Sequence, residues 1–190
     1  MQSLNLEKAK ELLNKHIKEG STLKHSRETE VIMRALAKHF GEDEDLWGIT
    51  GLLHDLDWEE IGNKHELHGK RTVEILKKEG LDSKEMLKAI LSHCESMDHV
   101  DEKRESKMDY CLSAAENITG IISAYVLVRP DKKIAEAKVK SINKKLKDKA
   151  FAANVSRELI YDIEKTGLQK NEFIQIALDA IKQIAAELGF

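Results

Sequence analysis

A histidine and an aspartate, His54 and Asp55, stand side by side where an apolar run over residues 47–53 comes to an end. Imidazole and carboxylate groups are strong ligands for divalent metals, and together they suit zinc, manganese or iron. Further histidines lie before and after the pair, separated from it by predicted helices. These residue types therefore predict a metal site.

Six residues are candidate ligands, and most of them come from separate segments of the chain. In chain order they are His25, His54, Asp55, His68, His93 and Glu116. In a helical bundle, each of several helices can lend one such side chain to a common interior point. A bound ion would then join the helices at the place where the chemistry occurs.

The elements that must position these ligands are predicted to be helices, because apolar residues recur at intervals of three and four and no segment alternates like a strand. The fold class is therefore all-α. Three helices are expected before the middle of the chain: from about Leu4 to Gly20, from Ser21 to Gly41 and from Glu44 to Asp55. A fourth carries His65 and His68 and ends at Gly80, and a fifth is capped by Asp82 or Ser83 and contains His93. A long helix then runs from Lys107 to Val128.

The chain of 190 residues fits a single domain, residues 1–190, because no repeat or low-complexity linker divides it. Its motif-bearing core is expected at about residues 20–130. A break at Arg129-Pro130 precedes a helical extension, residues 131–190, with one basic and two amphipathic helices. The charged segment 95–107 is expected to be a surface loop that could act as a lid.

The composition is typical of a soluble helical protein, with 41% apolar and 34% charged residues. A net charge of -3 provides no overall attraction to nucleic acid or to an anionic membrane. We expect no secretion signal and no window as long as a membrane span. Cys94 and Cys111 are too few and too far apart for a disulfide framework, so we expect them to pack in the core of a cytoplasmic protein.

The order of the candidate ligands, H…HD…H…H followed by an acid, resembles the HD-domain metal-dependent phosphohydrolases. The local contexts are also similar to those of this family over roughly residues 20–130. The matching segments are His25 at the start of a helix, Gly51-Leu52-Leu53-His54-Asp55, His68 with Val73-Glu74-Ile75-Leu76, Ala89-Ile90-Leu91-Ser92-His93 and Ala114-Ala115-Glu116-Asn117-Ile118-Thr119-Gly120. Each motif is weak alone, but together they are specific.

The resemblance implies one or two divalent ions, of manganese, iron, magnesium, cobalt or zinc. His25, His54, Asp55 and the terminal acid would hold the first ion, while His68 and His93 would support a second ion bridged by Asp55. Asp55 would then be catalytic, with metal-bound hydroxide attacking the phosphorus of a phosphomonoester or phosphoanhydride, for which a nucleotide is the expected substrate. Alternatives are a di-iron oxygenase of the HD type and a degenerate HD module that binds a nucleotide without turnover.

Two departures from the family pattern leave alternatives open. Glu116 stands where the family has aspartate, and its extra methylene permits a different coordination. Asp109 lies seven residues earlier, on nearly the same helical face, and could contribute instead. Thr72 stands where the family usually has a small residue, often glycine, and this change alone is expected to be tolerated. His65, one turn before His68, could replace that histidine.

Phosphate transfer also needs positive charge outside the metal site. The candidates for substrate binding are Arg71, Lys103, Arg104 and Arg129, of which Arg129 is also a candidate for catalysis. Residues 129–149 hold nine lysines and arginines against three acids, but no aromatic residue is interleaved with them, so a nucleic-acid platform is not expected. We therefore expect a small anionic phosphorylated substrate and no nucleic-acid or membrane partner. The sequence does not determine the oligomeric state.

Overall fold

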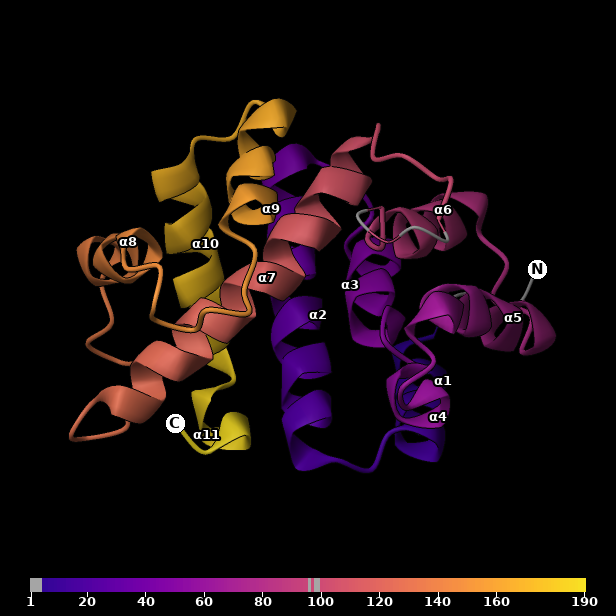
Figure 1. Cartoon of the computed structure of the whole chain (residues 1–190), viewed down its shortest axis with the longest axis horizontal. Coiled ribbons are helices and arrows are strands. Elements are labelled where there is room, and N and C mark those ends of the chain that lie inside the picture. The colour runs from indigo at the N-terminus through magenta and orange to yellow at the C-terminus, as the bar shows by residue number, and fades with distance from the viewer. Residues whose placement is uncertain (1–4, 96, 98–99) are drawn as a thin grey trace.

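Helices account for the regular structure of this protein in the computed structural model, which describes residues 5–95, 97 and 100–190 (Figure 1). These residues contain no β-strand, so the predicted all-α class is confirmed. Leu4, the expected start of the first helix, lies outside the described residues. The α-helices are α1 Leu6–His16, α2 Gly20–Phe40, α3 Glu44–Leu53, α4 Trp58–Ile61, α5 Lys70–Lys78, α6 Lys84–Ser92, α7 Lys107–Val128, α8 Val139–Lys147, α9 Arg157–Tyr161, α10 Lys170–Gln183 and α11 Ala185–Leu188; the 3-10 helices are η1 His65–Leu67 and η2 Asp162–Thr166.

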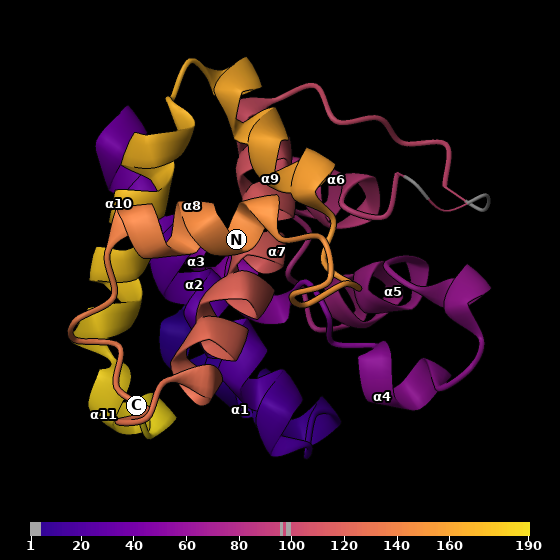
Figure 2. The same cartoon turned by 60° about the vertical axis from the view of Figure 1, so that its left-hand side comes forward.

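The buried apolar side chains form two clusters, and the candidate ligands come from the helices of both. The first cluster joins α2, α7 and α10, with Ile122 and Phe173 fully buried. The second joins α1, α3, α5 and α6, with Leu52 and Met86 fully buried. In both views α10 and α11 lie on one side of α7 and α4 to α6 on the other (Figures 1 and 2). The candidate ligands come from α2, α7 and the ends of α3, α5 and α6.

Close packing of α2 against α3 positions the His54-Asp55 pair. A Cβ atom on Gly51 would lie 2.9 Å from the carbonyl oxygen of Thr29 and 2.9 Å from Cγ of Met33, so only glycine allows this approach. Asp43 caps the start of α3 by accepting hydrogen bonds from the backbone N–H groups of residues 45 and 46. The last residue of α3, Leu53, is therefore held beside α2, and the metal-ligand pair follows it.

The predicted helix carrying both His65 and His68 is wrong, because two separate elements, η1 and α5, replace it. α4, η1 and α5 follow one another, and His68 lies between η1 and α5 with extended backbone angles of φ -58° and ψ 137°. Gly69 then has φ +75°, and a Cβ atom there would lie 3.1 Å from Sγ of Cys94. This turn brings His68 against the end of α6.

The expectation that no window is long enough to span a membrane is wrong for α7. Lys107–Val128 passes that test by length and by its mean hydropathy of 1.5. However, 61% of the window is buried inside the protein, where α7 packs against α2, α6 and α9. A core helix of a soluble protein passes the same test, so the hydropathy of α7 is explained by its position in the first cluster.

Residues 131–190 pack on the helices that carry the ligands. Phe173, Ile174 and Leu178 of α10 are fully buried in the cluster shared with α2 and α7. The backbone N–H of Ser156 donates a hydrogen bond of 3.1 Å to Oδ1 of Asn117, next to Glu116 on α7. The extension therefore shares its core with the motif-bearing helices.

Candidate metal centre

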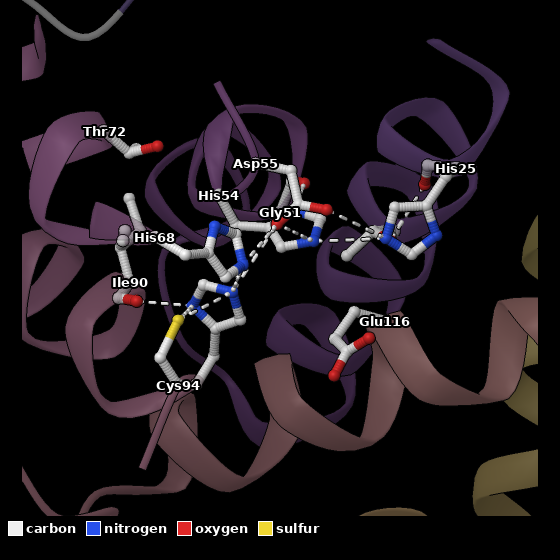
Figure 3. A network of polar contacts seen from close by, with 12 residues as sticks. His25, Gly51, His54, Asp55, His68, Thr72, Ile90, Cys94 and Glu116 are labelled. Carbon is white, nitrogen blue, oxygen red and sulfur yellow. Dashed lines mark hydrogen bonds and ion pairs between the residues drawn. The ribbon is translucent and has the colours of Figure 1, made fainter. Parts of the chain in front are cut away.

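The side chain of Asp55 lies at the meeting point of four histidines from separate elements (Figure 3). Its Oδ1 atom is 3.3 Å from Nε2 of His54 and 3.5 Å from Nε2 of both His68 and His93. Its Oδ2 atom is 3.6 Å from Nε2 of His25. The structure thus brings together five of the six predicted ligands around one carboxylate.

Backbone and side-chain acceptors fix the orientation of all four imidazole rings. Nδ1 of His54 is 2.8 Å from the carbonyl oxygen of Gly51, and Nδ1 of His93 bonds to that of Ile90. These carbonyls accept, so each Nδ1 must carry the proton. Side chains hold the other two rings.

Thr119 and Asp57 hold His25 and His68 in the same way. Oγ1 of Thr119 donates to the carbonyl oxygen of Glu116 at 2.6 Å, so it accepts from Nδ1 of His25 at 2.9 Å. Oδ1 of Asp57 accepts from Nδ1 of His68 at 2.8 Å. In the neutral form of each ring, Nε2 therefore has the lone pair and faces the centre, as in metal-binding histidines held by outer partners.

The spacing of these lone pairs fits bound cations. Nε2 of His25 and His54 lie 3.2 Å apart, as do Nε2 of His68 and His93. Lone pairs at that distance repel unless a proton or a metal ion lies between them. Zinc binds imidazole nitrogen at about 2.1 Å, so nitrogens this close can share one ion. The donor set therefore fits a divalent metal in each half.

The donors separate into two groups that Asp55 links. One group consists of His25, His54 and Asp55, and the other of His68, His93 and Cys94, with the ligand atoms of each group within 4.8 Å of one another. Since Asp55 also contacts His68 and His93, it is the residue that bridges the two halves.

The protonation equilibria differ between the two halves. Burial lowers the pKa of His25, and it lowers the pKa of His54 to about 3 despite the nearby charge of Asp55. Burial also opposes charge on Asp55, but the imidazole of His54 and a hydrogen bond from His93 hold the pKa of this carboxyl well below its usual range. The first half is therefore neutral imidazole beside carboxylate, which is the form that binds metal.

In the second half the pKa values of both histidines are raised. Burial would lower the pKa of His68, yet hydrogen bonds to Asp57 and Cys94 raise it to about 9. Burial would also lower the pKa of His93, but Cys94 and Asp55 outweigh it and raise this pKa well above its usual range. These protons supply the positive charge that a metal ion would supply, so metal binding there would release them.

Glu116 lies on α7 beside the cluster, but it belongs to neither group of close ligand atoms. Its carboxylate faces the histidines in Figure 3 and accepts a hydrogen bond from the side chain of Asn117. Burial, together with the charge of Asp55, outweighs the attraction of His93 and raises the pKa of Glu116 to about 8. It remains a predicted ligand.

The alternative ligands Asp109 and His65 are placed elsewhere. Oδ2 of Asp109 accepts from the backbone N–H groups of residues 105 and 106 and forms the capping box at the start of α7. His65 is exposed, with its ring 5.9 Å from that of Trp58, whereas His68 is buried in the cluster. The geometry favours Glu116 and His68.

The predicted substrate-binding cations are not gathered at the centre. Arg71 pairs with Glu60 and Glu74 on the surface. Arg129 pairs with Asp131, and the 13 residues between it and Glu116 correspond to about 20 Å along α7. The roles of these arginines in binding and catalysis stay predictions.

The two loop cations lie closer to the second half. Arg104 donates to the carbonyl oxygen of Ser92 at 3.2 Å and pairs with Glu95 at 3.2 Å, while Lys103 lies 3.8 Å from Glu95. Both therefore stand near the end of α6, one or two residues from His93. Their contact with substrate stays a prediction, as does the action of segment 95–107 as a lid.

Sequence reasoning missed Asp57, Thr119 and Cys94. Asp57 is fully buried two residues after Asp55, and a second acid so close to an HD pair was an available signal. Cys94 directly follows His93, and that adjacency was the signal for a ligand. Burial opposes ionisation of Cys94, but the charges and hydrogen bonds of His93 and His68 lower the pKa of its thiol to about 6. Thr119 lies in the family-like segment 114–120, but its side chain was given no role there.

A buried glutamate beside the centre makes stability depend on pH. Glu28 is 2% exposed and lines a pocket of about 220 Å³ together with His25. Burial raises its pKa to about 7, although Ser123 donates a hydrogen bond to it at 2.7 Å and Lys24 lies nearby. The folded state thus keeps a proton that the unfolded state loses above its ordinary pKa of 4.5. Stability must fall as pH rises from about 4.5 to 7.

We therefore expect Glu28→Gln to be more stabilising at pH 7.5 than at pH 4.5, by roughly 3 kcal/mol. Urea unfolding of the metal-free wild type and variant across this range measures the difference. Exposed Glu158→Gln is the control and should parallel the wild type. If the wild type and Glu28→Gln differ in free energy of unfolding by the same amount at every pH, the raised pKa of Glu28 would be contradicted.

The helical arrangement and the order of its ligands define the class of this protein. Residues 22–120 match the HD domain family, and the chain belongs to that family. The HD family consists largely of metal-dependent phosphohydrolases, as the resemblance implied.

Ribonuclease Y of Oceanobacillus iheyensis is similar to this chain, with 30% identity over 176 residues that cover 88% of the chain and 32% of ribonuclease Y. The chain therefore spans about a third of that relative's length. No solved structure matches the chain.

Proposed function

We propose that this protein is a metal-dependent hydrolase that cleaves a phosphomonoester or phosphoanhydride, with a nucleotide as substrate. The observation that carries the proposal is the convergence of four fixed Nε2 lone pairs on both oxygens of Asp55. Membership of the HD family supports phosphate chemistry at such a centre.

The first ion would be held by His25, His54, Asp55 and Glu116, and the second by His68, His93 and Asp55. Bound divalent ions would polarise a phosphoryl oxygen and lower the pKa of an attacking water. Asp57 and Thr119 keep the rings of His68 and His25 oriented, so the donors need not reorganise when substrate arrives. His25 is the most exposed of the four rings, which favours substrate entry on its side.

Elemental analysis of protein purified without chelators, paired with a phosphate-release screen over nucleoside mono-, di- and triphosphates, tests this proposal. We expect one or two ions per chain and release that a chelator abolishes and metal restores. Bound iron with oxygen consumption would instead support the di-iron oxygenase. Nucleotide binding without product in the fully loaded protein would support the degenerate module.

RNA is a second candidate substrate, because the similar protein is named a ribonuclease. In addition, the structure places an aromatic ring beside the basic segment, where the sequence pattern shows none. Two pockets of about 410 and 420 Å³ share Lys147, and the second is also lined by Lys140 and Lys144. Within the described part of the chain, no carboxylate forms an ion pair with these three lysines. The exposed ring of Tyr161 lines the first pocket.

Basic side chains beside an exposed aromatic ring are typical of single-strand binding. The sequence argument against nucleic acid rested on the absence of aromatic residues from the basic segment, and α9 supplies one from outside it. Including a labelled RNA oligonucleotide in the same screen tests this candidate, with cleavage products in place of free phosphate as the readout. We also infer a reducing, cytoplasmic location, which the two free cysteines support.

Replacing Glu116 with aspartate is expected to keep or raise activity, because it restores the acid of the family pattern. The metal content and the phosphate-release rate of Glu116→Asp and Glu116→Gln measure this effect. The glutamine variant serves as the control, since it keeps the length of the side chain but loses its charge, and we expect it to bind metal less tightly. Complete loss of activity in Glu116→Asp would show that the centre is built around glutamate.

A further inference from the structure

Cys94 lies in the second half of the centre, beside the two histidines. Its Sγ atom is 3.5 Å from Nε2 of His93 and forms, with His68 and His93, the group whose ligand atoms lie within 4.8 Å of one another. The residue is 1% exposed. In Figure 3 Cys94 and His68 lie on the same side of the cluster. The sulfur is also 3.6 Å from Nδ1 of His93, and it is close enough to the two histidines to become a third donor to a shared ion.

The surrounding backbone holds the thiol in this position. The N–H of Cys94 donates to the carbonyl oxygen of Leu91 at 3.1 Å in the turn that ends α6. Gly69 packs against the sulfur on the opposite side, where even a Cβ atom would approach it to 3.1 Å. The segment that carries His68 is thus packed directly onto the thiol.

The second cysteine of the chain has a different environment. Cys111 is fully buried in the apolar cluster around α7, where it packs as a small hydrophobic residue. The sequence prediction of a packing role thus fits Cys111. Cys94 shares its site with two imidazoles.

We propose that Cys94 is a thiolate ligand of the ion held by His68 and His93, so that this half takes zinc or another thiophilic divalent metal. The proposal rests on the metal centre described under the proposed function. On binding, the S–H bond breaks, the sulfur–metal bond forms and the proton passes to solvent. Thiolate and imidazole together are typical zinc ligands.

The first half has a harder donor set. His25, His54 and Asp55 contribute nitrogen and oxygen, which also suit manganese or iron. The two halves are therefore expected to differ in metal preference, with the preference for zinc stronger where the sulfur lies.

Loading metal-free protein with Co²⁺ tests the proposal by spectroscopy. Thiolate bound to Co²⁺ produces a charge-transfer band in the near ultraviolet, which imidazole and carboxylate ligands do not. We expect the band in the wild type and in Cys111→Ser, and its loss in Cys94→Ser. Zinc affinity of the second half should fall at least about 10-fold in Cys94→Ser, because even partners outside the metal shell contribute that much. Manganese binding to the first half should be unchanged.

Thiol protection provides a second measurement that does not need Cys94→Ser to fold. In Cys111→Ser, Cys94 is the sole thiol. Zn²⁺ should protect it from alkylation, while Mn²⁺ added at a concentration that fills the first half should not.

The outcomes separate this inference from the proposed function. Wild-type protein that binds no divalent metal would overturn the metal centre as a whole. Two bound ions with no charge-transfer band and no protection of the thiol would overturn the role of Cys94 and leave the centre intact.

Discussion

Asp55→Asn loses metal from both halves of the centre, with affinity falling by more than about 100-fold and phosphate release falling with it. The reason is that Oδ1 and Oδ2 of this one carboxylate contact the Nε2 atoms of four histidines. Changes to partners outside the metal shell already cost about 10–100-fold, and a residue that contacts both halves must cost more. Asparagine keeps the shape of the side chain but not its charge.

Metal content per chain, measured after purification without chelators, checks this result. His54→Ala is a second, independent variant and should also lose metal. Asp179→Asn is the matched control, because this aspartate is 56% exposed on α10 and, among the residues that the structure describes, forms an ion pair with Lys182 alone. Unchanged metal content in both Asp55→Asn and His54→Ala would refute the metal centre.

Asp57→Ala is expected to lower the free energy of unfolding by about 3 kcal/mol or more, the largest stability effect among these variants. The buried carboxylate accepts from Nδ1 of His68 at 2.8 Å and from the backbone N–H groups of Gly69 and Thr72 at 2.7 and 3.1 Å. Removing it leaves three buried donors without an acceptor, and each such loss costs about 1–3 kcal/mol.

The same change should release the ring of His68 and weaken the second half of the centre alone. Urea unfolding of metal-free protein measures the first effect, and titration with Zn²⁺ measures the second. Asp57→Asn keeps one acceptor oxygen and should be less severe, and Asp179→Ala should match the wild type. Wild-type stability and two tightly bound ions in Asp57→Ala would show that Asp57 anchors neither α5 nor His68.

Local sequence signals were sufficient for much of the fold, because helix formation depends on residues three and four apart. The apolar periodicity and the break at Arg129-Pro130 predicted α7, and the ordered histidines predicted the members of the cluster. The break at Gly69 was missed, since its φ of +75° and its close approach to Cys94, a residue 25 positions away, belong to the tertiary structure.

The sequence by itself determined the all-α class and the donor types of the centre, since the chemistry of imidazole and carboxylate belongs to the residues. Only the tertiary structure decided which side chains share one ion. It grouped His25 with His54 and Asp55, and it brought Cys94 to His68 and His93. These choices depend on how helices distant in sequence pack, and the pattern within a single helix carries no record of its neighbours.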